Sequence, residues 1–219
     1  MYDVRTPGGR AVHFEVRDGT SDVSVIHSTS IHDEYGMKGL RLSGWALDIG
    51  AHIGSVCIPL AIDNPDLRVI AIEALPENAK QLQANVTANG MDERIYVVPL
   101  AASDDDEPVD LQRLPSDADR FIANAFTAVG RTDMIRSTVE ATSLTNLLAD
   151  IDEVVWAKMD CEGCEWRVFL DPAIAKLQYI TGEWHGDTST ALLNALLDTH
   201  NVSILEDNGG IGHFTAVRK

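Results

Sequence analysis

Carboxylates and a histidine follow two apolar runs in the second half of the chain. Asp160 and Glu162 come after the run VVWAKM, and Glu183 and His185 come after QYITG. If these runs are parallel strands, their carboxyl ends share one edge of the sheet and the side chains meet there. Like charges in one cleft raise each other's pKa, which suits acid–base chemistry, and an imidazole titrates near neutral pH. We therefore predict His185 as a general base, with Asp160 and Glu183 as catalytic partners.

The same carboxylates permit a second interpretation. A divalent cation would relieve their mutual repulsion, and Asp160, Glu162 and Glu183 are then the candidate ligands, for example for Mg²⁺. For Glu165 we weigh a catalytic role against that of an acid at a helix N-terminus. The sequence alone does not choose between base, structural and metal-binding roles.

A glycine turn follows the first apolar run of the core, in DIGAHIG at residues 48–54. Gly50 and Gly54 let the backbone approach a ligand, and we expect the first N–H groups of the next helix to face it. About 20 residues further on, Glu73 ends the next apolar run, where a carboxylate accepts hydrogen bonds from a ribose diol. Together they predict a cofactor that contains adenosine. The alternative is an ordinary strand-to-helix turn and a surface glutamate.

Details of the turn favour one adenosine cofactor. A nicotinamide fingerprint needs G-x-G-x-x-G, and His52 stands at its second glycine. Asp48 suits a cationic ligand that carries an ammonium and a sulfonium. S-adenosylmethionine therefore fits better than NAD.

The chain has three cysteines, of which Cys161 and Cys164 form a C-x-x-C. An odd number of cysteines makes a disulfide framework improbable and agrees with a reducing compartment. A zinc site would need further ligands, and Cys57 lies in an apolar helical stretch. We interpret Cys161 and Cys164 as packing residues.

These residues must be positioned by an α/β fold, because short apolar runs alternate with helical patterns from residue 45 onwards. We expect a single domain over residues 1–219, with an N-terminal extension or cap at 1–44, a Rossmann-like core at 45–219 and an excursion at about 103–142 that covers the site. The predicted strands are 45–49, 68–73, 94–98, 137–141, 154–160, 178–183, 202–206 and 213–218. The predicted helices are 55–62, 76–88, 144–149 with Thr142 as N-cap, one after Gly163, and 189–199. Asn208-Gly209-Gly210 predicts a hairpin, so the last strand runs antiparallel to its neighbour.

Composition restricts the class of partner. The chain has 219 residues, 17 Lys and Arg against 34 Asp and Glu, and a formal net charge of -17. A field of this sign repels phosphate backbones and anionic lipids, so we expect neither nucleic acid nor membrane as partner. No apolar run approaches the roughly 20 residues that cross a bilayer, and residues 1–10 do not resemble a signal peptide. We expect a cytoplasmic protein.

Four motifs in order resemble the FkbM family of S-adenosylmethionine-dependent methyltransferases. They are DIGAHIG at 48–54, AIEALPENAKQLQANVTANG at 71–90, PLAAS at 99–103 and KMDCEGCEW at 158–166. The resemblance covers about residues 23–183. It implies a Rossmann-like methyltransferase fold, a mostly parallel seven-stranded sheet with an antiparallel C-terminal hairpin strand and helices on both faces.

The resemblance also implies roles for individual residues. Asp48, Gly50 and Gly54 would line the methionine end of the cofactor, and Glu73 would hold the ribose hydroxyls. The family usually has Asn where this chain has His52. The other residues implied at the cofactor are Tyr35, Ser55, Ala74, Asn78, Ala101 and Ala102.

The reaction implied is methyl transfer of the EC 2.1.1 type, to an oxygen of a small molecule such as a sugar or a natural product. Three alternatives stay open: a tRNA or other nucleic-acid methyltransferase, an NAD-dependent oxidoreductase, and a binding module that holds the cofactor without turnover. The net charge argues against the first. His52, the carboxylates after residue 159 and the terminal hairpin argue against the second.

Overall fold

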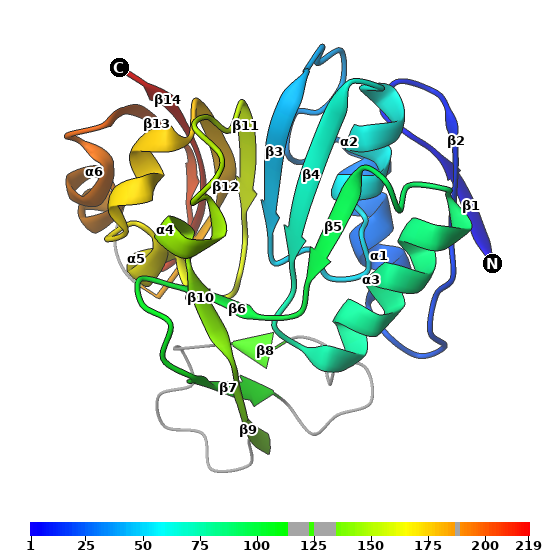
Figure 1. Ribbon diagram of the computed structural model, residues 1–219, viewed down its shortest axis with the longest axis horizontal. Coiled ribbons are helices and arrows are strands. Elements are labelled where there is room, and N and C mark those ends of the chain that lie inside the picture. The colour runs from blue at the N-terminus through cyan, green and yellow to red at the C-terminus, as the bar shows by residue number, and fades with distance from the viewer. Residues whose placement is uncertain (114–122, 125–134, 187–188) are drawn as a thin grey trace.

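The computed structural model describes residues 1–113, 123–124, 135–186 and 189–219. Its centre is a seven-stranded sheet made of β3 (Gly44–Ile49), β4 (Leu67–Ile72), β5 (Ile95–Val98), β11 (Trp156–Met159), β12 (Tyr179–His185), β13 (His200–Asp207) and β14 (Ile211–Arg218). The strand order is β13-β14-β12-β11-β3-β4-β5 (Figure 1). Neighbouring strands are parallel except that β14 runs antiparallel to both β12 and β13. The predicted mostly parallel sheet with an antiparallel hairpin strand is confirmed.

Helices cover both faces of this sheet, as the nearly continuous burial of β3, β4 and β11 requires. The helices are α1 (Asp22–Ile26), the π-helical turn η1 (His27–Ile31), α2 (Cys57–Asp63), α3 (Pro76–Ala88), α4 (Leu144–Leu147), α5 (Glu165–Val168), the 3₁₀ turn η2 (Pro172–Lys176) and α6 (Ser189–Leu196). On β4, Val69 and Ala71 join a core with α1, α2 and α3, whereas Ile70 and Ile72 join a core with α4, α5 and α6. The period of two along each strand thus builds two separate cores.

The N-terminal segment packs against the α2–α3 side of the sheet (Figure 1). A hairpin of β1 (Tyr2–Arg5) and β2 (Ala11–Phe14) precedes α1, and Phe14 is fully buried. The Arg17 guanidinium forms hydrogen bonds to both carboxylate oxygens of Asp22 and to Oδ1 of Asn78. These bonds fix the start of α1 against α3. The sequence patterns did not predict the hairpin, α1 or η1.

Between β5 and β11 the chain forms two small sheets below the edge where β3, β4 and β11 end (Figure 1). The strands β6 (Ala101–Ser103) and β10 (Ala141–Ser143) are parallel, and β7 (Val109–Arg113) pairs antiparallel with β8 (Ala123–Asn124) and β9 (Ile135–Val139). The strand predicted at 137–141 is therefore divided between two sheets. Residues 114–122 and 125–134 of the predicted excursion at about 103–142 lie outside the described residues.

Several predicted boundaries shift for local reasons. Helix α3 has the bounds predicted for it, but the N-cap of α4 is Ser143 and not Thr142. Thr142 lies within β10, whereas the Ser143 Oγ accepts a hydrogen bond from the Asn146 N–H at 3.1 Å. Strand β12 continues to His185, two residues past its predicted end. Within the described ranges, none of the helices is long and apolar enough to cross a membrane.

Candidate active site

A cavity of about 300 Å³ opens beyond the carboxyl ends of β3, β4 and β11. At one end, here called the glycine-turn end, lie Gly50, His52, Glu73 and Asn78. At the other, the carboxylate end, lie Glu34, Asp160, Glu162 and Glu183. Small polar residues of α1 and η1 and the alanines of β6 form further walls.

Most residues predicted for the site line this cavity. They are Tyr35, Gly50, His52, Ser55, Glu73, Ala74, Asn78, Ala101, Ala102, Asp160, Glu162 and Glu183. Three predicted residues, Asp48, Gly54 and His185, do not belong to its walls. Each of the three instead contacts residues that do.

Asp48 is fully buried behind the glycine turn. Its Oδ2 accepts the N–H of Cys57, the first residue of α2, at 3.1 Å, and its Oδ1 lies 3.5 Å from the Lys158 Nζ. Burial raises the pKa of Asp48, and the lysine charge opposes this shift. The carboxylate therefore caps α2 and pairs with Lys158. It does not line the cavity, although the resemblance implied that it would.

Gly50 and Gly54 both have positive φ angles, of 76° and 94°, but they serve different contacts. A Cβ on Gly50 would lie 1.8 Å from the Asp160 carbonyl oxygen, so only glycine lets the turns after β3 and β11 meet. A Cβ on Gly54 would meet the Ile58 and Leu82 side chains, so Gly54 serves helix packing. The N–H groups of Gly50 and Ala51 both donate to the Ile72 carbonyl. The expectation that the first N–H groups of the next helix face a ligand is wrong, because the Cys57 N–H donates to Asp48 and the Ile58 N–H to the Gly54 carbonyl.

Glu73 is held at the edge of the cavity by three protein donors. Its Oε2 accepts the His52 N–H at 2.8 Å, and its Oε1 accepts the Leu75 N–H at 2.9 Å and the Asn78 amide at 3.3 Å. An ionised carboxylate offers about four acceptor sites. About one acceptor site is left for a ligand. The contact with both hydroxyls of a ribose, predicted from the sequence, would use more acceptor sites than this.

Among the described residues, two buried polar atoms in the cavity wall have no hydrogen-bond partner. They are the Nδ1 of His52 and the Oγ of Ser21. Burial lowers the pKa of His52 to about 4, so its ring is neutral at physiological pH. Unpartnered buried polar atoms are costly unless a ligand or water satisfies them. Their presence fits a polar ligand in the cavity.

Tyr35 and Lys158 link the two ends of the cavity. The Tyr35 hydroxyl donates to the Asp160 Oδ2 at 2.9 Å, and the Lys158 Nζ lies 5.5 Å from the centre of the tyrosine ring. The same ammonium donates to the Gly50 carbonyl at 2.7 Å and lies 3.7 Å from Asp160. Burial opposes ionisation of Asp160, but the Lys158 and His185 charges and the Tyr35 hydrogen bond together outweigh it and lower the pKa of Asp160.

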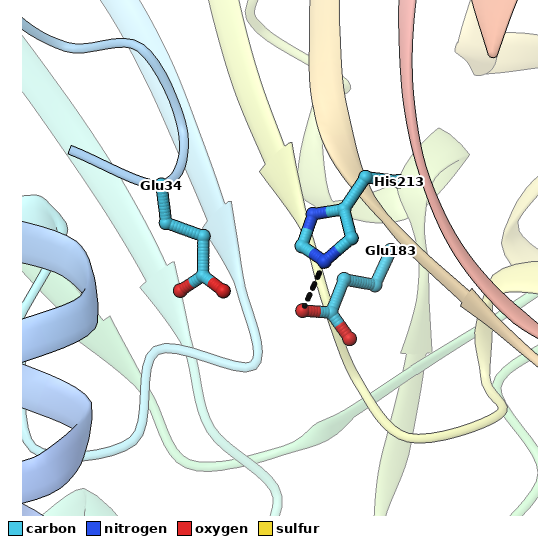
Figure 2. Close-up of side chains that lie close together, drawn as sticks. All are labelled: Glu34, Glu183 and His213. Carbon is cyan, nitrogen blue, oxygen red and sulfur yellow. Dashed lines mark ion pairs between the residues drawn. The ribbon is translucent and has the colours of Figure 1, made fainter. Parts of the chain in front are cut away.

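Glu183 lies between two imidazoles at the carboxylate end. In Figure 2, Glu183 and its register partner His213 face Glu34 across a gap. The His213 Nε2 lies 3.2 Å from the Glu183 Oε1, and the His185 Nε2 lies 3.4 Å from the Glu183 Oε2. The other ring nitrogen of His185 lies 3.2 Å from Oε1 of the buried Glu165.

These contacts determine the charge of His185 and Glu162. Burial alone would lower the pKa of His185, but hydrogen bonds to Glu165 and Glu183 raise it to about 11, so the imidazole is protonated at neutral pH. Burial and the Asp160 charge raise the pKa of Glu162 to about 7. Glu162 also has a φ of 58°, a strained conformation of the kind that clusters at functional sites.

Two sets of side chains bring possible metal-ligand atoms within 4.8 Å of one another. One is Asp160, Glu183 and His185, and the other is Glu34, Glu183 and His213. Glu162, a ligand candidate from the sequence, is in neither set among the described residues. Each set includes an imidazole, which Mg²⁺ does not prefer, and each oxygen of Glu183 already faces an imidazole nitrogen. The predicted Mg²⁺ site therefore fits these residues poorly.

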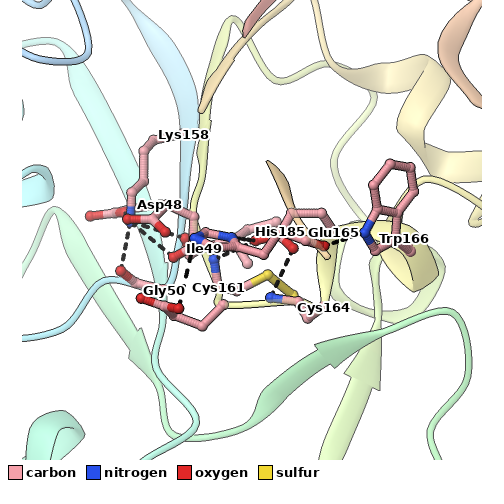
Figure 3. Close-up of a disulfide and its surroundings, with 12 residues drawn as sticks. Asp48, Ile49, Gly50, Lys158, Cys161, Cys164, Glu165, Trp166 and His185 are labelled. Carbon is pink, nitrogen blue, oxygen red and sulfur yellow. Dashed lines mark hydrogen bonds and ion pairs between the residues drawn. A yellow bond between two sulfur atoms is a disulfide. The ribbon is translucent and has the colours of Figure 1, made fainter. Parts of the chain in front are cut away.

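Cys161 and Cys164 form a disulfide, which corrects their interpretation as simple packing residues (Figure 3). The intervening Glu162 and Gly163 both have positive φ, and this tight turn brings the two Cα atoms to 5.5 Å, within the range of a disulfide. Cys57 is free and buried, in agreement with its predicted place in an apolar helix.

The sequence reasoning missed Lys158, Glu34, and the face of α1 and η1. Lys158 stands in a run of buried residues, WAKM, and a charge within a buried strand is a signal for a functional or paired group. Ser21, Ser24 and Ser28 all line the cavity, and their spacing along a helix would have indicated a shared polar face. No local signal distinguished Glu34.

A family model, Methyltransferase FkbM domain, matches residues 48–203 of the chain. The chain belongs to the FkbM methyltransferase family. The match confirms the resemblance seen in the four motifs and includes the turns after β3 and β11. The matched segment thus includes the residues that line both ends of the cavity, except for the lining residues between positions 21 and 35.

Two curated relatives of this FkbM chain share 59 aligned residues with it. O-methyltransferase imqG of Aspergillus flavus is 39% identical over this stretch, and Ribosomal RNA small subunit methyltransferase G of Frankia alni is 37% identical. The stretch is 27% of this chain but only 24% and 22% of the two relatives. The alignment therefore spans about a quarter of the length of each.

Solved structures confirm the fold of this FkbM member. The Precorrin-6y C5,15-methyltransferase from Geobacter metallireducens superposes with a TM-score of 0.50 and 14% identity over 94% of this chain and 95% of its own. A T. thermophilus 16S rRNA methyltransferase, solved in complex with AdoMet and guanosine, superposes with a TM-score of 0.50 and 14% identity. The superposition covers 100% of this chain and 50% of the other. The fold is that of class I methyltransferases.

Proposed function

We propose that this FkbM methyltransferase transfers a methyl group from S-adenosylmethionine to a hydroxyl of a small molecule. The observation that carries the proposal is that the cavity described above has two chemically different ends. The glycine-turn end has a neutral imidazole and a carboxylate held in place by backbone N–H groups. The carboxylate end has a strained glutamate whose pKa is close to neutral.

The glycine-turn end would hold the adenosine part of the cofactor. Glu73 would accept one ribose hydroxyl, since about one of its acceptor sites is free. Ala74, Ala101 and Ala102 leave room for the flat adenine, and the unpartnered Nδ1 of His52 would gain a polar partner. When bound, S-adenosylmethionine would supply a methyl group on a sulfonium, which the nearby Asp160 carboxylate favours electrostatically.

At the carboxylate end we propose Glu162 as the group that takes the proton from the acceptor hydroxyl. It lines the cavity, whereas His185 does not, and its carboxylate titrates near neutral pH. His185 is a positioning residue in this proposal, because its Nε2 lies 3.7 Å from Glu162 and 3.4 Å from Glu183. The oxygen that loses its proton would bond to the methyl carbon while the bond from that carbon to the cofactor sulfur breaks, and the demethylated cofactor would be the leaving group.

The charge around the cavity favours a neutral or cationic acceptor. Glu34, Asp160, Glu162 and Glu183 line this end, and Lys158 is already engaged by carbonyl groups and Asp48. Such a surface repels the phosphates of RNA, the substrate class in the name of the Frankia relative. A small molecule is therefore favoured over a nucleic acid.

Isothermal titration calorimetry tests the cofactor. We expect S-adenosylmethionine and its demethylated product to bind and NAD not to bind, and a preference for NAD would overturn the proposal. A panel of sugars, phenols and RNA fragments with methyl-labelled cofactor then tests the acceptor by mass spectrometry. Label on RNA alone, with none on any hydroxylated small molecule, would contradict the proposed acceptor class.

A further inference from the structure

The loop that joins β11 to α5 carries the disulfide and the proposed base together. Cys161 and Cys164 flank Glu162 and Gly163, and both cysteines line the same cavity as Glu162. Figure 3 shows the disulfide below His185 and Glu165 and to the right of Gly50. A covalent closure of this loop therefore acts directly on the carboxylate end.

The loop is held from two sides. On one side the buried Glu165 accepts the N–H of Cys161 through Oε1 and the N–H of Gly163 through Oε2, both at 2.9 Å. On the other side the disulfide joins the ends of the turn. Glu162 has a left-handed φ of 58°, which a residue with a Cβ adopts only when its surroundings impose it.

We propose that Cys161–Cys164 is a reversible thiol–disulfide modification site that controls the position of Glu162. The inference rests on the proposed function, because Glu162 is the base in that reaction. In the oxidised state the covalent ring keeps Glu162 turned into the cavity. After reduction the Glu165 hydrogen bonds and the His185 contact remain, but without the covalent ring Glu162 relaxes toward an ordinary backbone conformation.

The chemistry requires a dithiol as co-reactant. One thiolate of the dithiol attacks the Sγ of Cys161, which is the half-buried cysteine of the pair. The S–S bond breaks, and a mixed disulfide forms between Cys161 and the reductant. The second thiol of the reductant resolves the mixed disulfide. Cys161 and Cys164 end as two thiols that have gained two electrons and two protons, and the reductant ends as its own disulfide.

The test compares the full chain after incubation with reduced or oxidised dithiothreitol. Mass spectrometry of alkylated protein counts the free thiols in each state. We expect the oxidised protein to transfer methyl groups about 10- to 100-fold faster, since a small displacement of a catalytic group has effects of this size. We expect cofactor affinity by calorimetry to stay the same, because Glu73 and His52 are anchored to other loops.

Two variants provide matched controls. Cys161→Ser combined with Cys164→Ser should show the reduced rate under both conditions, whereas Cys57→Ser, which removes the buried free thiol, should keep the full response. Equal rates for oxidised and reduced wild type would overturn the inference. So would a failure of the two thiols to re-form a disulfide with oxidised dithiothreitol.

Hydrogen exchange separates this inference from the proposed function. Reduction should increase amide exchange in the peptide that contains Cys161 and Gly163, whose N–H groups donate to Glu165. If exchange responds but no acceptor in the panel is methylated, the proposed function fails and the thiol switch of the loop stands. If methylation is found and neither rate nor exchange responds to reduction, the switch fails and the function stands.

Discussion

The glycine-turn end and the carboxylate end of the cavity differ in how far apart along the chain their residues lie. Gly50, His52, Glu73 and Asn78 come from two consecutive strand-to-helix turns, and backbone N–H groups hold the central carboxylate. The carboxylate end gathers Glu34 from the N-terminal segment, the loop after β11, and strands β12 and β14. One end is thus built by local backbone geometry, and the other by side chains that only the complete sheet brings together.

This difference predicts that substitutions at the two ends change different quantities. The glycine-turn end should control cofactor affinity, and the carboxylate end should control the rate of methyl transfer. A variant that changes both quantities equally would break the division.

The largest effect is expected from Glu162→Gln, which removes the proposed base but keeps its shape. Methyl transfer to the acceptor found in the panel should fall by about 10²- to 10⁴-fold, the usual contribution of general base catalysis. Cofactor affinity should not change. Glu153→Gln, an exposed carboxylate near the start of β11, is the matched control and should keep full activity.

The pH profile sharpens this prediction. The pKa of Glu162 is raised to about 7, so the carboxylate is mostly protonated below this pH and ionised above it. Only the ionised form accepts a proton, and kcat/KM of the wild type should therefore rise as the pH passes through about 7. If the wild-type profile lacks this rise, or if the Glu162→Gln profile keeps it, then a group other than Glu162 accepts the proton of the acceptor hydroxyl.

Glu73→Ala should have the next largest effect, at the other end. It removes the acceptor for the His52 and Leu75 N–H groups and, in the proposed cofactor complex, for one ribose hydroxyl. Cofactor binding should weaken by about 1 to 3 kcal/mol, the cost of losing a hydrogen bond to a charged group. Calorimetry measures this loss, and Glu93→Ala, exposed at the far edge of the sheet, should bind like the wild type.

Tyr35→Phe tests the link between the ends and should have a smaller effect. It removes the 2.9 Å hydrogen bond to Asp160 from a side chain that is only 4% exposed. The free energy of unfolding, measured with urea, should fall by about 1 to 2 kcal/mol. Tyr96→Phe, on a tyrosine that is 43% exposed, should leave stability unchanged.

The smallest effect should come from chelation. His185 is protonated and faces Glu183, so these carboxylates are compensated by the protein itself. Activity should therefore survive EDTA. Loss on chelation with recovery in Mg²⁺ would instead make Asp160 and Glu183 metal ligands.

The same contrast explains what could be predicted from the sequence. The strands β3, β4 and β5, helix α3 and the terminal hairpin were all recognisable, because apolar periodicity, Pro76 and the Asn-Gly signals act locally. The glycine turn and Glu73 were recognisable for the same reason. These features depend on neighbours within a few residues.

What could not be predicted depends on contacts between distant segments. Asp48 and His185 were expected in the cavity wall, but one caps α2 beside Lys158 and the other lies among three glutamates. Glu34 joins the site through the N-terminal segment, which Arg17 ties to Asn78 and Tyr35 ties to Asp160. The spacing of these residues along the chain does not predict the contacts between them.

The contact between Gly50 and the Asp160 carbonyl limits how such a protein could be re-engineered. A loop grafted from another methyltransferase in place of residues 160–165 would alter acceptor preference only if its backbone still followed the same path past Gly50. A donor loop that runs closer to Gly50 would push the turn after β3 away and disturb the glycine-turn end as well. Donor loops should therefore be chosen first by backbone trace and only afterwards by side chain.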